Sequence, residues 1–181
     1  MSRTIDVELP EEAVRSAIQS AVDQALDALE AMRAAEGENL EKDLRARLER
    51  IEELAAVLEA RSGEVMQACK ARLTARAKEL SEEVGELDEA RLHQEVVMAA
   101  DKLDIVEEVV RLRSHVGQFL SIVDETERGR PGGRRLDFLL QEMGREANTV
   151  GSKASDASMA HSVVELKTEL ERIREQVQNI E

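Results

Sequence analysis

The chain has 181 residues, of which 42% are hydrophobic and 35% charged but only 1% aromatic, with two prolines and nine glycines. So few turn residues exclude a many-stranded sheet, and packing by aliphatic side chains is typical of helical bundles and coiled coils. The net charge of -14 opposes diffuse attraction to nucleic acid or anionic membranes, so any phosphate-binding site must be local. We therefore predict an all-α protein of long amphipathic helices in a helical hairpin or bundle with coiled-coil-like packing.

The chain shows none of the sequence features of an exported or membrane-bound protein. A single cysteine, Cys69, excludes an intrachain disulfide framework. The start from Met1 to Pro10 has neither a basic segment nor an apolar stretch, and no apolar run is long enough to cross a bilayer. We therefore predict a cytoplasmic protein without a membrane partner.

Residues 1–85 are predicted to form a long helical arm. Pro10 and the two glutamates after it suit a helix start, because proline is tolerated in the first turn and carboxylates favour the positive end of a helix. Apolar residues three and four positions apart then form one stripe, which begins with Val14, Ile18, Val22, Leu26, Leu29 and Met32 and continues to Leu80. Gly37 and Gly63 are points where the arm can bend, and around Gly85 we expect the chain to reverse into a helical hairpin.

Residues 86–127 are predicted to form an acidic helical segment that ends near Asp124. Beside its apolar stripe, one helical face carries Asp101, Asp104, Glu108, Arg111 and His115. Carboxylate and imidazole ligands suit Mg²⁺ or Mn²⁺, so this face is a candidate metal site. The alternative is a solvated face on which acids pair with arginine.

Residues 128–135 are predicted to form a loop rich in glycine and arginine. Four of its side chains are guanidinium groups, which match phosphate geometry: Arg128, Arg130, Arg134 and Arg135. The loop is therefore the candidate RNA contact, and the alternative is an ordinary solvent-exposed loop. Because the only two aromatic residues, Phe119 and Phe138, suit core positions, we expect contact with the RNA backbone rather than with bases.

Residues 136–181 are predicted to form two further helices joined by the small, polar stretch 151–158, with Asp156 as the cap of the second. Polar residues on the first of these helices fall on two adjacent faces, one with Asp137, Gln141, Arg145 and Asn148 and the other with Glu142, Glu146, Thr149 and Lys153. Such residues favour specific hydrogen bonds, although an interface between helices would use them equally well. The second helix repeats apolar residues in a heptad pattern from Val163 to Ile180, which is typical of a packing helix.

Several motifs, taken together, resemble the terminal signature of the YicC-like family. The longest is Arg134-Arg-Leu-Asp-Phe-Leu-Leu-Gln-Glu-Met-Gly-Arg-Glu-Ala-Asn-Thr149, followed by Gly151-Ser-Lys153, and the ending from Val164 to Glu181 resembles the family too. Upstream, Ala100-Asp-Lys102 and Arg111-Leu-Arg-Ser-His115 are also similar. The resemblance covers nearly the whole chain. The chain departs from the family pattern in two respects. Family members usually carry a sizeable N-terminal domain before the helical part, whereas this chain resembles the helical part only. In addition, Gly144 stands where the family commonly has asparagine.

The resemblance implies a bacterial cytoplasmic endoribonuclease that depends on a divalent cation, Mn²⁺ or Mg²⁺, and assembles as a homo-oligomer, with a hexamer as the first expectation. This chain would correspond to the C-terminal half. We assign catalytic roles to Glu142, Glu146, His115 and Asp137, and metal binding to Asp101, Asp104 and Glu108. RNA contacts are assigned to Arg128, Arg130, Arg134, Arg135, Arg111, Arg145 and Lys153. The rival hypotheses are a non-catalytic helical scaffold and an RNA-binding module without hydrolysis.

Overall fold

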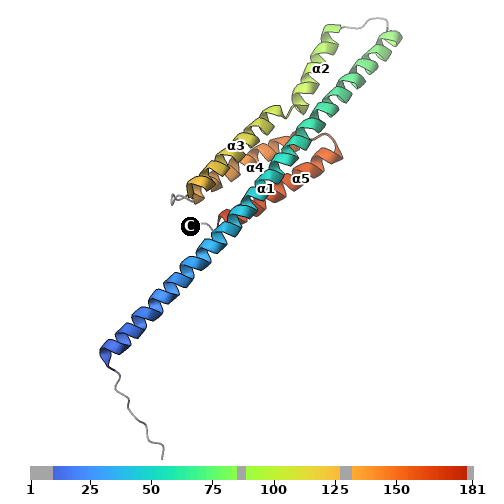
Figure 1. Ribbon diagram of the computed structural model, residues 1–181. Coiled ribbons are helices and arrows are strands. Elements are labelled where there is room, and N and C mark those ends of the chain that lie inside the picture. Colours follow the sequence, from blue (N-terminus) through green and yellow to red (C-terminus); the bar gives the residue numbers. More distant parts are fainter. Residues whose placement is uncertain (1–9, 85–88, 127–131, 179–181) are drawn as a thin grey trace, which may run out of the picture. The chain divides into compact units, whose positions relative to one another are not determined.

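The computed structural model describes residues 10–84, 89–126 and 132–178, which form helices and no strands (Figure 1). The helices of the described residues are α1 (Glu11–Val84), α2 (Glu89–Leu103), α3 (Val106–Thr126), α4 (Gly133–Lys153) and α5 (Ala157–Val177). The prediction of an all-α fold is therefore confirmed. Among these residues no helix combines the length and the apolar character that crossing a membrane requires.

Helix α1 begins directly after Pro10, whose carbonyl accepts the first backbone hydrogen bonds, and runs unbroken through Gly37 and Gly63. An internal glycine costs about 1 kcal/mol relative to alanine, which a helix of 74 residues absorbs. The helix ends at Val84, next to the predicted reversal. Helix α2 then runs back beside α1, and side chains of both helices line a common cavity, among them Leu73 and Leu103. The predicted helical hairpin is present.

The chain divides into two compact units inside α1, between Asp43 and Leu44. In the first unit the apolar stripe of α1 is exposed, with Ile18 and Met32 both at 59%. Leu44, at 2%, is the first residue of α1 with a buried side chain. Helix α1 therefore enters a core long before it ends.

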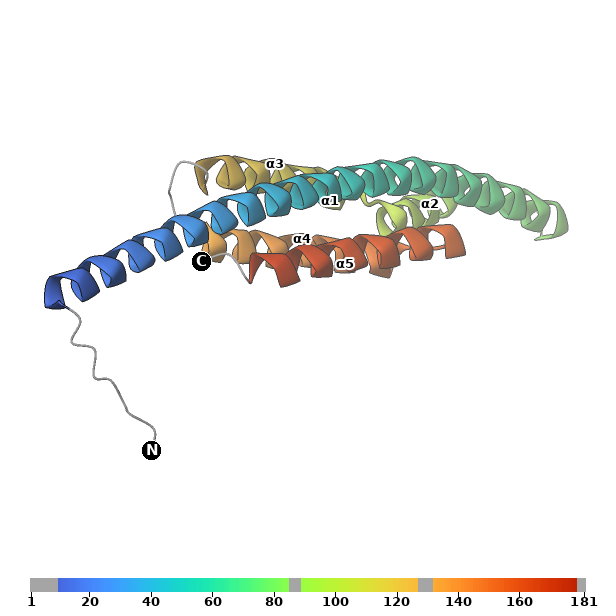
Figure 2. The same ribbon diagram turned by 60° about the horizontal axis from the view of Figure 1, so that its bottom comes forward.

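The second unit is a helical bundle in which α3 packs on α4 and α4 packs on α5 (Figure 2). From Leu44 onward α1 lies alongside α3 and α5, to which it is joined by the ion pairs Arg113–Glu59 and Arg47–Glu169, both at 2.9 Å. The core is aliphatic apart from one ring, as the composition requires, and includes Leu48, Ile51, Leu58, Ile105, Leu112, Val116, Phe119, Leu136, Met143, Leu166 and Ile173. Five members of the predicted heptad of α5 are buried, and Ile180 lies outside the described residues.

The predicted helical segment 86–127 is not one continuous helix in the described residues, because the chain breaks at Asp104 and Ile105 between α2 and α3. The Asp104 carboxylate accepts a hydrogen bond of 2.9 Å from the backbone N–H of Val106 and so caps α3. Ile105 is fully buried, which holds the break in place. The sequence carried the signal, since Asp104 is followed three positions later by Glu107 in a capping-box pattern.

Helix α4 is longer at both ends than predicted. It begins at Gly133, so Arg134 and Arg135 lie in its first turn and not in a loop, and the backbone N–H of Arg135 donates to the Gly132 carbonyl. It continues to Lys153, which leaves residues 154–156 as the connection to α5. Asp156 caps α5 as predicted, because its carboxylate accepts the Met159 N–H at 2.8 Å.

Candidate active site along helices α3 and α4

Charged side chains gather where α3 and α4 meet at the edge of the core. The two helices are antiparallel, since Lys153 at the end of α4 contacts Glu108 near the start of α3. We call the set Glu108, Arg111, His115, Glu146 and Lys153 the α3–α4 seam. Both glutamates are buried, Glu108 at 7% and Glu146 at 8% exposure. Charged residues are seldom buried unless they are paired, so each of these carboxylates should have a partner.

Lys153 closes one end of the seam. Its ammonium group donates to the Glu108 carboxylate at 2.8 Å and to the backbone carbonyl of Asp104 at 2.7 Å. The second carboxylate oxygen of Glu108 is buried and has no hydrogen-bond partner in the described part of the chain. These contacts join the start of α3 to the end of α4, so this end of the seam has a structural role.

Arg111 links the two helices at the next position. Its guanidinium pairs with Glu107 on its own helix and lies 3.6 Å from the Glu146 carboxylate on α4. The hydrogen bond that Arg111 donates to Glu107, followed by the negative charges of Glu107 and Glu146, raises the pKa of Arg111 and keeps it charged. About half of the Arg111 side chain remains exposed, so the guanidinium is accessible to a phosphate.

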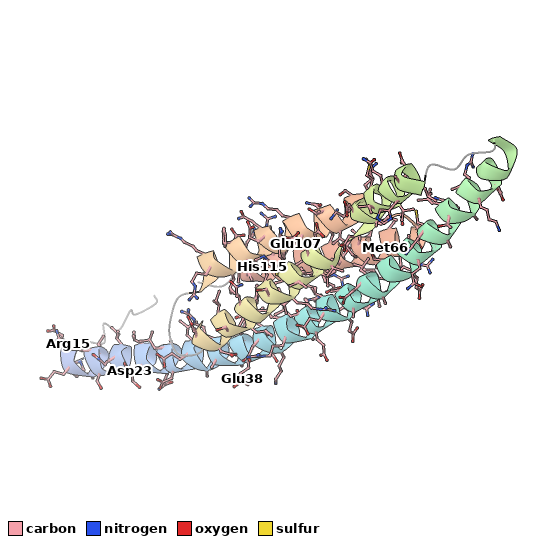
Figure 3. The ribbon with its side chains drawn as sticks, turned by 90° about the horizontal axis from the view of Figure 1, so that it is seen from above. Arg15, Asp23, Glu38, Met66, Glu107 and His115 are labelled. Carbon is pink, nitrogen blue, oxygen red and sulfur yellow. The ribbon has the colours of Figure 1, made fainter. Side chains whose placement is uncertain are left out.

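His115 lies one helical turn beyond Arg111, and Figure 3 shows it with Glu107 along α3. The side chain is partly exposed, and its Nδ1 is buried without a hydrogen-bond partner in the described part of the chain. The helices are antiparallel and Arg111 faces Glu146. One turn further along α3, His115 therefore lies opposite the turn of α4 that contains Glu142. The seam therefore places an imidazole, a guanidinium and a buried carboxylate within neighbouring turns.

The residues predicted to bind a metal ion do not converge. Asp101 is exposed on α2. The Asp104 carboxylate accepts the Val106 N–H at the start of α3, and the Glu108 carboxylate forms an ion pair with Lys153. Within residues 10–84, 89–126 and 132–178, no group of three or more His, Cys, Asp or Glu side chains is placed to hold a metal ion. The described residues thus do not fit a metal site, and metal dependence stays a prediction.

The remaining predicted residues are distributed over other parts of α4. Asp137 accepts a hydrogen bond from Gln141 at 2.9 Å and lies 4.0 Å from Arg174 of α5, so it is on the opposite side of α4 from the seam. Arg145 is exposed and pairs with Glu142 at 2.6 Å. Arg135 pairs with Glu125 at 2.7 Å, and Arg134 is exposed. Arg128 and Arg130 lie outside the described residues.

Phe138 does not occupy the core position that its residue type suggests. It is 60% exposed, whereas Phe119 is fully buried as expected. The available signal was its place in the sequence, because Phe138 lies outside the apolar stripe formed by Leu136, Leu140 and Met143.

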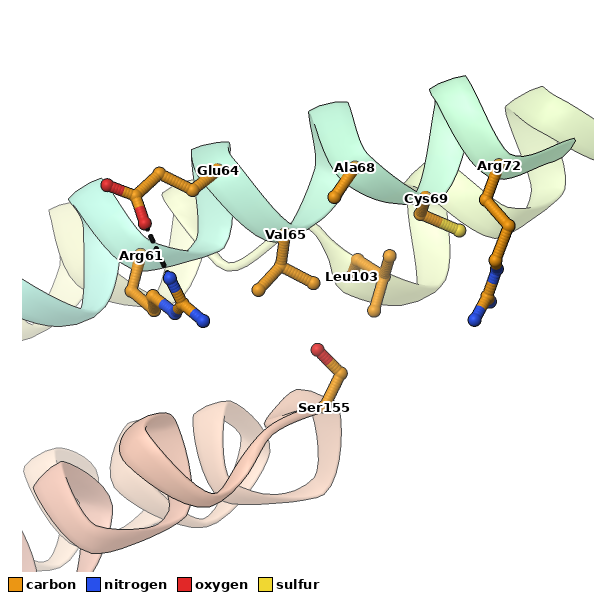
Figure 4. A pocket seen from close by; sticks show the side chains of 8 residues that line it. All are labelled: Arg61, Glu64, Val65, Ala68, Cys69, Arg72, Leu103 and Ser155. Carbon is orange, nitrogen blue, oxygen red and sulfur yellow. Dashed lines mark hydrogen bonds and ion pairs between the residues drawn. The ribbon is translucent and has the colours of Figure 1, made fainter. Parts of the chain in front are cut away.

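A cavity of about 500 Å³ lies between α1, the end of α2 and the α4–α5 connection, with Arg61, Cys69, Leu103 and Ser155 among its lining residues (Figure 4). Arg61 pairs with Asp156 at 2.7 Å and with Glu64 at 2.6 Å. The hydrogen bond with Asp156, and then that with Glu64, raises the pKa of Arg61. Two carboxylates therefore engage this guanidinium, which fastens the start of α5 to α1.

Comparison with known proteins places these features in a named domain. Residues 58–181 match a family model described as "Endoribonuclease YicC-like, C-terminal". The chain is 42% identical over 171 residues to "Probable endoribonuclease YicC" of Clostridioides difficile (strain 630), and 35% identical over 170 residues to the protein of that name in Haemophilus influenzae. Each alignment covers 94% of this chain and 57% of the relative, so the chain spans little more than half of their length.

Proposed function

Because the chain belongs to the endoribonuclease YicC-like family, we propose that it hydrolyses phosphodiester bonds within RNA in the bacterial cytoplasm. The observation that supports this proposal is the α3–α4 seam, in which Arg111 and Glu146 meet across two helices beside His115. The whole seam lies inside the segment that matches the family model, residues 58–181. Neighbouring acid, base and cationic groups are what phosphodiester cleavage requires.

In the proposed mechanism one of His115 and Glu146 removes a proton from the water that attacks phosphorus. The other protonates the leaving ribose oxygen as its bond to phosphorus breaks, while Arg111 binds the phosphate. An imidazole serves as both general acid and general base near neutral pH, and a buried carboxylate is shielded from competing water. A phosphate oxygen would replace the Glu107 carboxylate on Arg111. Because the Glu107 side chain is 73% exposed, giving up that ion pair costs little.

We propose that activity depends on Mn²⁺ or Mg²⁺, as the family resemblance implies. The described residues do not assemble a group of metal ligands, and the proposed mechanism assigns no step to a metal ion. The requirement is measured by adding each ion alone and by removing it with a chelator. Unchanged cleavage in the presence of chelator would refute the metal dependence and leave the roles of His115 and Glu146 to be judged separately.

The proposal is tested by incubating the protein with end-labelled RNA and mapping internal cuts. We expect Glu146→Gln and His115→Asn to reduce the cleavage rate by about 100-fold or more, the usual contribution of an acid–base group. A matched control is Glu169→Gln on α5. The side chain of Glu169 is 14% exposed, close to the 11% of Glu146, and both glutamates form ion pairs with arginine. The control should stay within about twofold of the unaltered chain.

Two outcomes would contradict a catalytic seam. Intact RNA at every protein concentration, with either metal ion, would favour a helical scaffold or a binding module. An equal loss of activity in Glu169→Gln and Glu146→Gln would show that a general loss of stability, and not chemistry at the seam, explains the effect. Circular dichroism of each variant separates these cases.

We also propose that the chain associates with copies of itself, with a hexamer as the first expectation. The exposed stripe of α1 in the first unit supports this, because Ile18, Leu26 and Met32 are 59%, 52% and 59% exposed on one helical face. Sedimentation velocity should show an oligomer that Ile18→Glu with Leu26→Glu dissociates. Val164→Glu, at a position 61% exposed on α5, is the control and should not change the sedimentation coefficient.

A further inference from the structure

The outer face of α4 carries the only exposed phenyl ring of the chain, that of Phe138. The sequence has two phenylalanines and neither Trp nor Tyr, and of the two Phe119 is buried while Phe138 is 60% exposed. An isolated exposed phenylalanine loses the hydrophobic stabilisation that burial would give, of the order of 2 kcal/mol. The exposed ring is therefore available for contact with another molecule.

The inner face of α4 is complete without Phe138. Its buried apolar residues are Leu136, Leu139, Leu140, Met143, Ala147 and Val150, which pack against α3 and α5. Phe138 points away from these residues, at roughly 160° to 200° around the helix from Leu136 and Leu140. The ring therefore contributes little to the stability of the bundle, and its replacement should leave the fold intact.

Cationic side chains flank the ring on the same face. Arg134 lies one turn before Phe138 and Arg145 two turns after it, both within roughly 40° of it around the helix. Both arginines are exposed, and Arg145 is 71% exposed. The acid of this face, Glu142, is 23% exposed and already paired with Arg145. An aromatic ring between guanidinium groups is the arrangement that single-stranded nucleic acids favour, because bases stack on the ring while phosphates bind the cations.

We infer that Phe138 stacks on an unpaired base of a single-stranded RNA, with Arg134 and Arg145 on the phosphates to either side. The inference rests on the proposed function for its biological role, although binding is measured independently of cleavage. Glu146 lies roughly 80° around α4 from Phe138, so an RNA strand on this face runs beside the α3–α4 seam. Phe138 is thus a residue that selects unpaired RNA over a duplex, whose bases are already stacked on one another.

A second copy of the chain is the competing occupant of this face. A protein interface needs a contiguous apolar surface at its centre, whereas the neighbours of Phe138 on this face are Arg134, Gln141, Arg145 and Thr149, all exposed and polar. A single ring between two arginines, without other exposed apolar side chains around it, fits the repeating charge and base of RNA better than the apolar centre of a protein interface. The test separates the two occupants.

Binding is measured by anisotropy with a labelled, unstructured RNA of mixed sequence and with a blunt RNA duplex, in the presence of chelator so that no cleavage intervenes. We expect Phe138→Ala and Phe138→Leu each to weaken the binding of single-stranded RNA by about tenfold or more, since both lose the ring. Phe138→Tyr keeps the ring and should stay within about twofold. Val164→Ala, which removes an exposed apolar side chain from α5, should have no effect.

A spectroscopic variant reports stacking directly. Because the chain has no Trp or Tyr, Phe138→Trp introduces the only indole, and stacking on an RNA base should quench its fluorescence. Val164→Trp is the matched control on α5, and single-stranded RNA should leave its fluorescence unchanged. The duplex should quench neither indole.

Four results would overturn the inference. These are no binding of single-stranded RNA by the unaltered chain, unchanged affinity in Phe138→Ala, equal affinities for Phe138→Leu and Phe138→Tyr, and an unquenched indole in Phe138→Trp. Sedimentation velocity on Phe138→Ala identifies the competing case, because a lost oligomer with unchanged RNA affinity would assign the face to a second copy. Cleavage that fails in every variant while Phe138 still controls binding would refute the proposed enzyme and leave the stacking intact.

Discussion

Replacing Lys153 by methionine should destabilise the protein strongly, because it leaves a buried carboxylate without its cation. The ammonium group of Lys153 lies 2.8 Å from a Glu108 oxygen, and the side chain of Glu108 is only 9% exposed. The other oxygen of Glu108 already has no hydrogen-bond partner in the described part of the chain. Methionine preserves the length and apolar stem of lysine, so the substitution removes charge with little change in packing.

The expected cost follows from these exposures. Removing one partner of a buried ion pair typically costs about 3–5 kcal/mol. Lys153 is 27% exposed, so water can reach part of the site, and we expect the lower end of that range, about 3 kcal/mol. Glu108→Leu should cost less, about 1 kcal/mol, because the ammonium can turn toward water on its flexible stem. The double variant should regain most of the loss, since neither charge is then left unpaired.

The measurement is urea unfolding followed by far-ultraviolet circular dichroism on the two single variants and the double variant. With a slope of about 2 kcal/mol per molar, Lys153→Met should lower the unfolding midpoint by about 1.5 M. Arg172→Met is the control, because its partner Glu169 keeps a second ion pair, from Arg47. That exposed arginine should contribute less than about 1 kcal/mol.

Additive effects of Lys153→Met and Glu108→Leu would contradict this prediction. If the double variant were destabilised by the sum of the two single effects, Glu108 and Lys153 would not be energetically coupled. A loss below about 0.5 kcal/mol for Lys153→Met would show that the Glu108 carboxylate is well solvated, contrary to its burial.

Three further outcomes follow from the described contacts. Gly144→Ala should stabilise the protein by about 1 kcal/mol in urea unfolding, because a Cβ at this helical position meets no other atom within 4 Å. Gly151→Ala should give no such gain in stability, or should destabilise the protein, because its Cβ would lie 3.1 Å from a side-chain carbon of α5. A gain equal to that of Gly144→Ala would contradict the close contact between the two helices. Asp156→Asn should lower the unfolding midpoint at pH 7, because the Met159 N–H and then Arg61 stabilise the carboxylate and lower its pKa. Because the pKa of Asp156 is lower in the folded state, its stabilising effect is present above about pH 4 and is lost on further acidification. The difference in unfolding midpoint between Asp156→Asn and the unaltered chain should therefore shrink below that pH. A constant difference would contradict the stabilising role of the Asp156 carboxylate.

The helices and most of their inner faces could be predicted from the amino-acid pattern alone. Leu136, Leu140 and Met143 are buried where the periodicity put them, and Asp156 caps α5 as its residue type indicated. These features are local, because a helix presents residues three and four apart on one side whatever it packs against. The resemblance to the YicC-like family was equally a property of the sequence, and the match over residues 58–181 confirms it.

Contacts between polar residues could not be predicted in the same way, because they depend on how the helices pack. Asp101, Asp104 and Glu108 share one face of an ideal helix, but the break at Ile105 separates them and gives Glu108 to Lys153. The partners lie 45 residues apart, so no pattern within one helix indicates that they touch. The same packing brings Arg111 to Glu146, because the contacts between helices are made by whichever side chains face one another after the bundle closes.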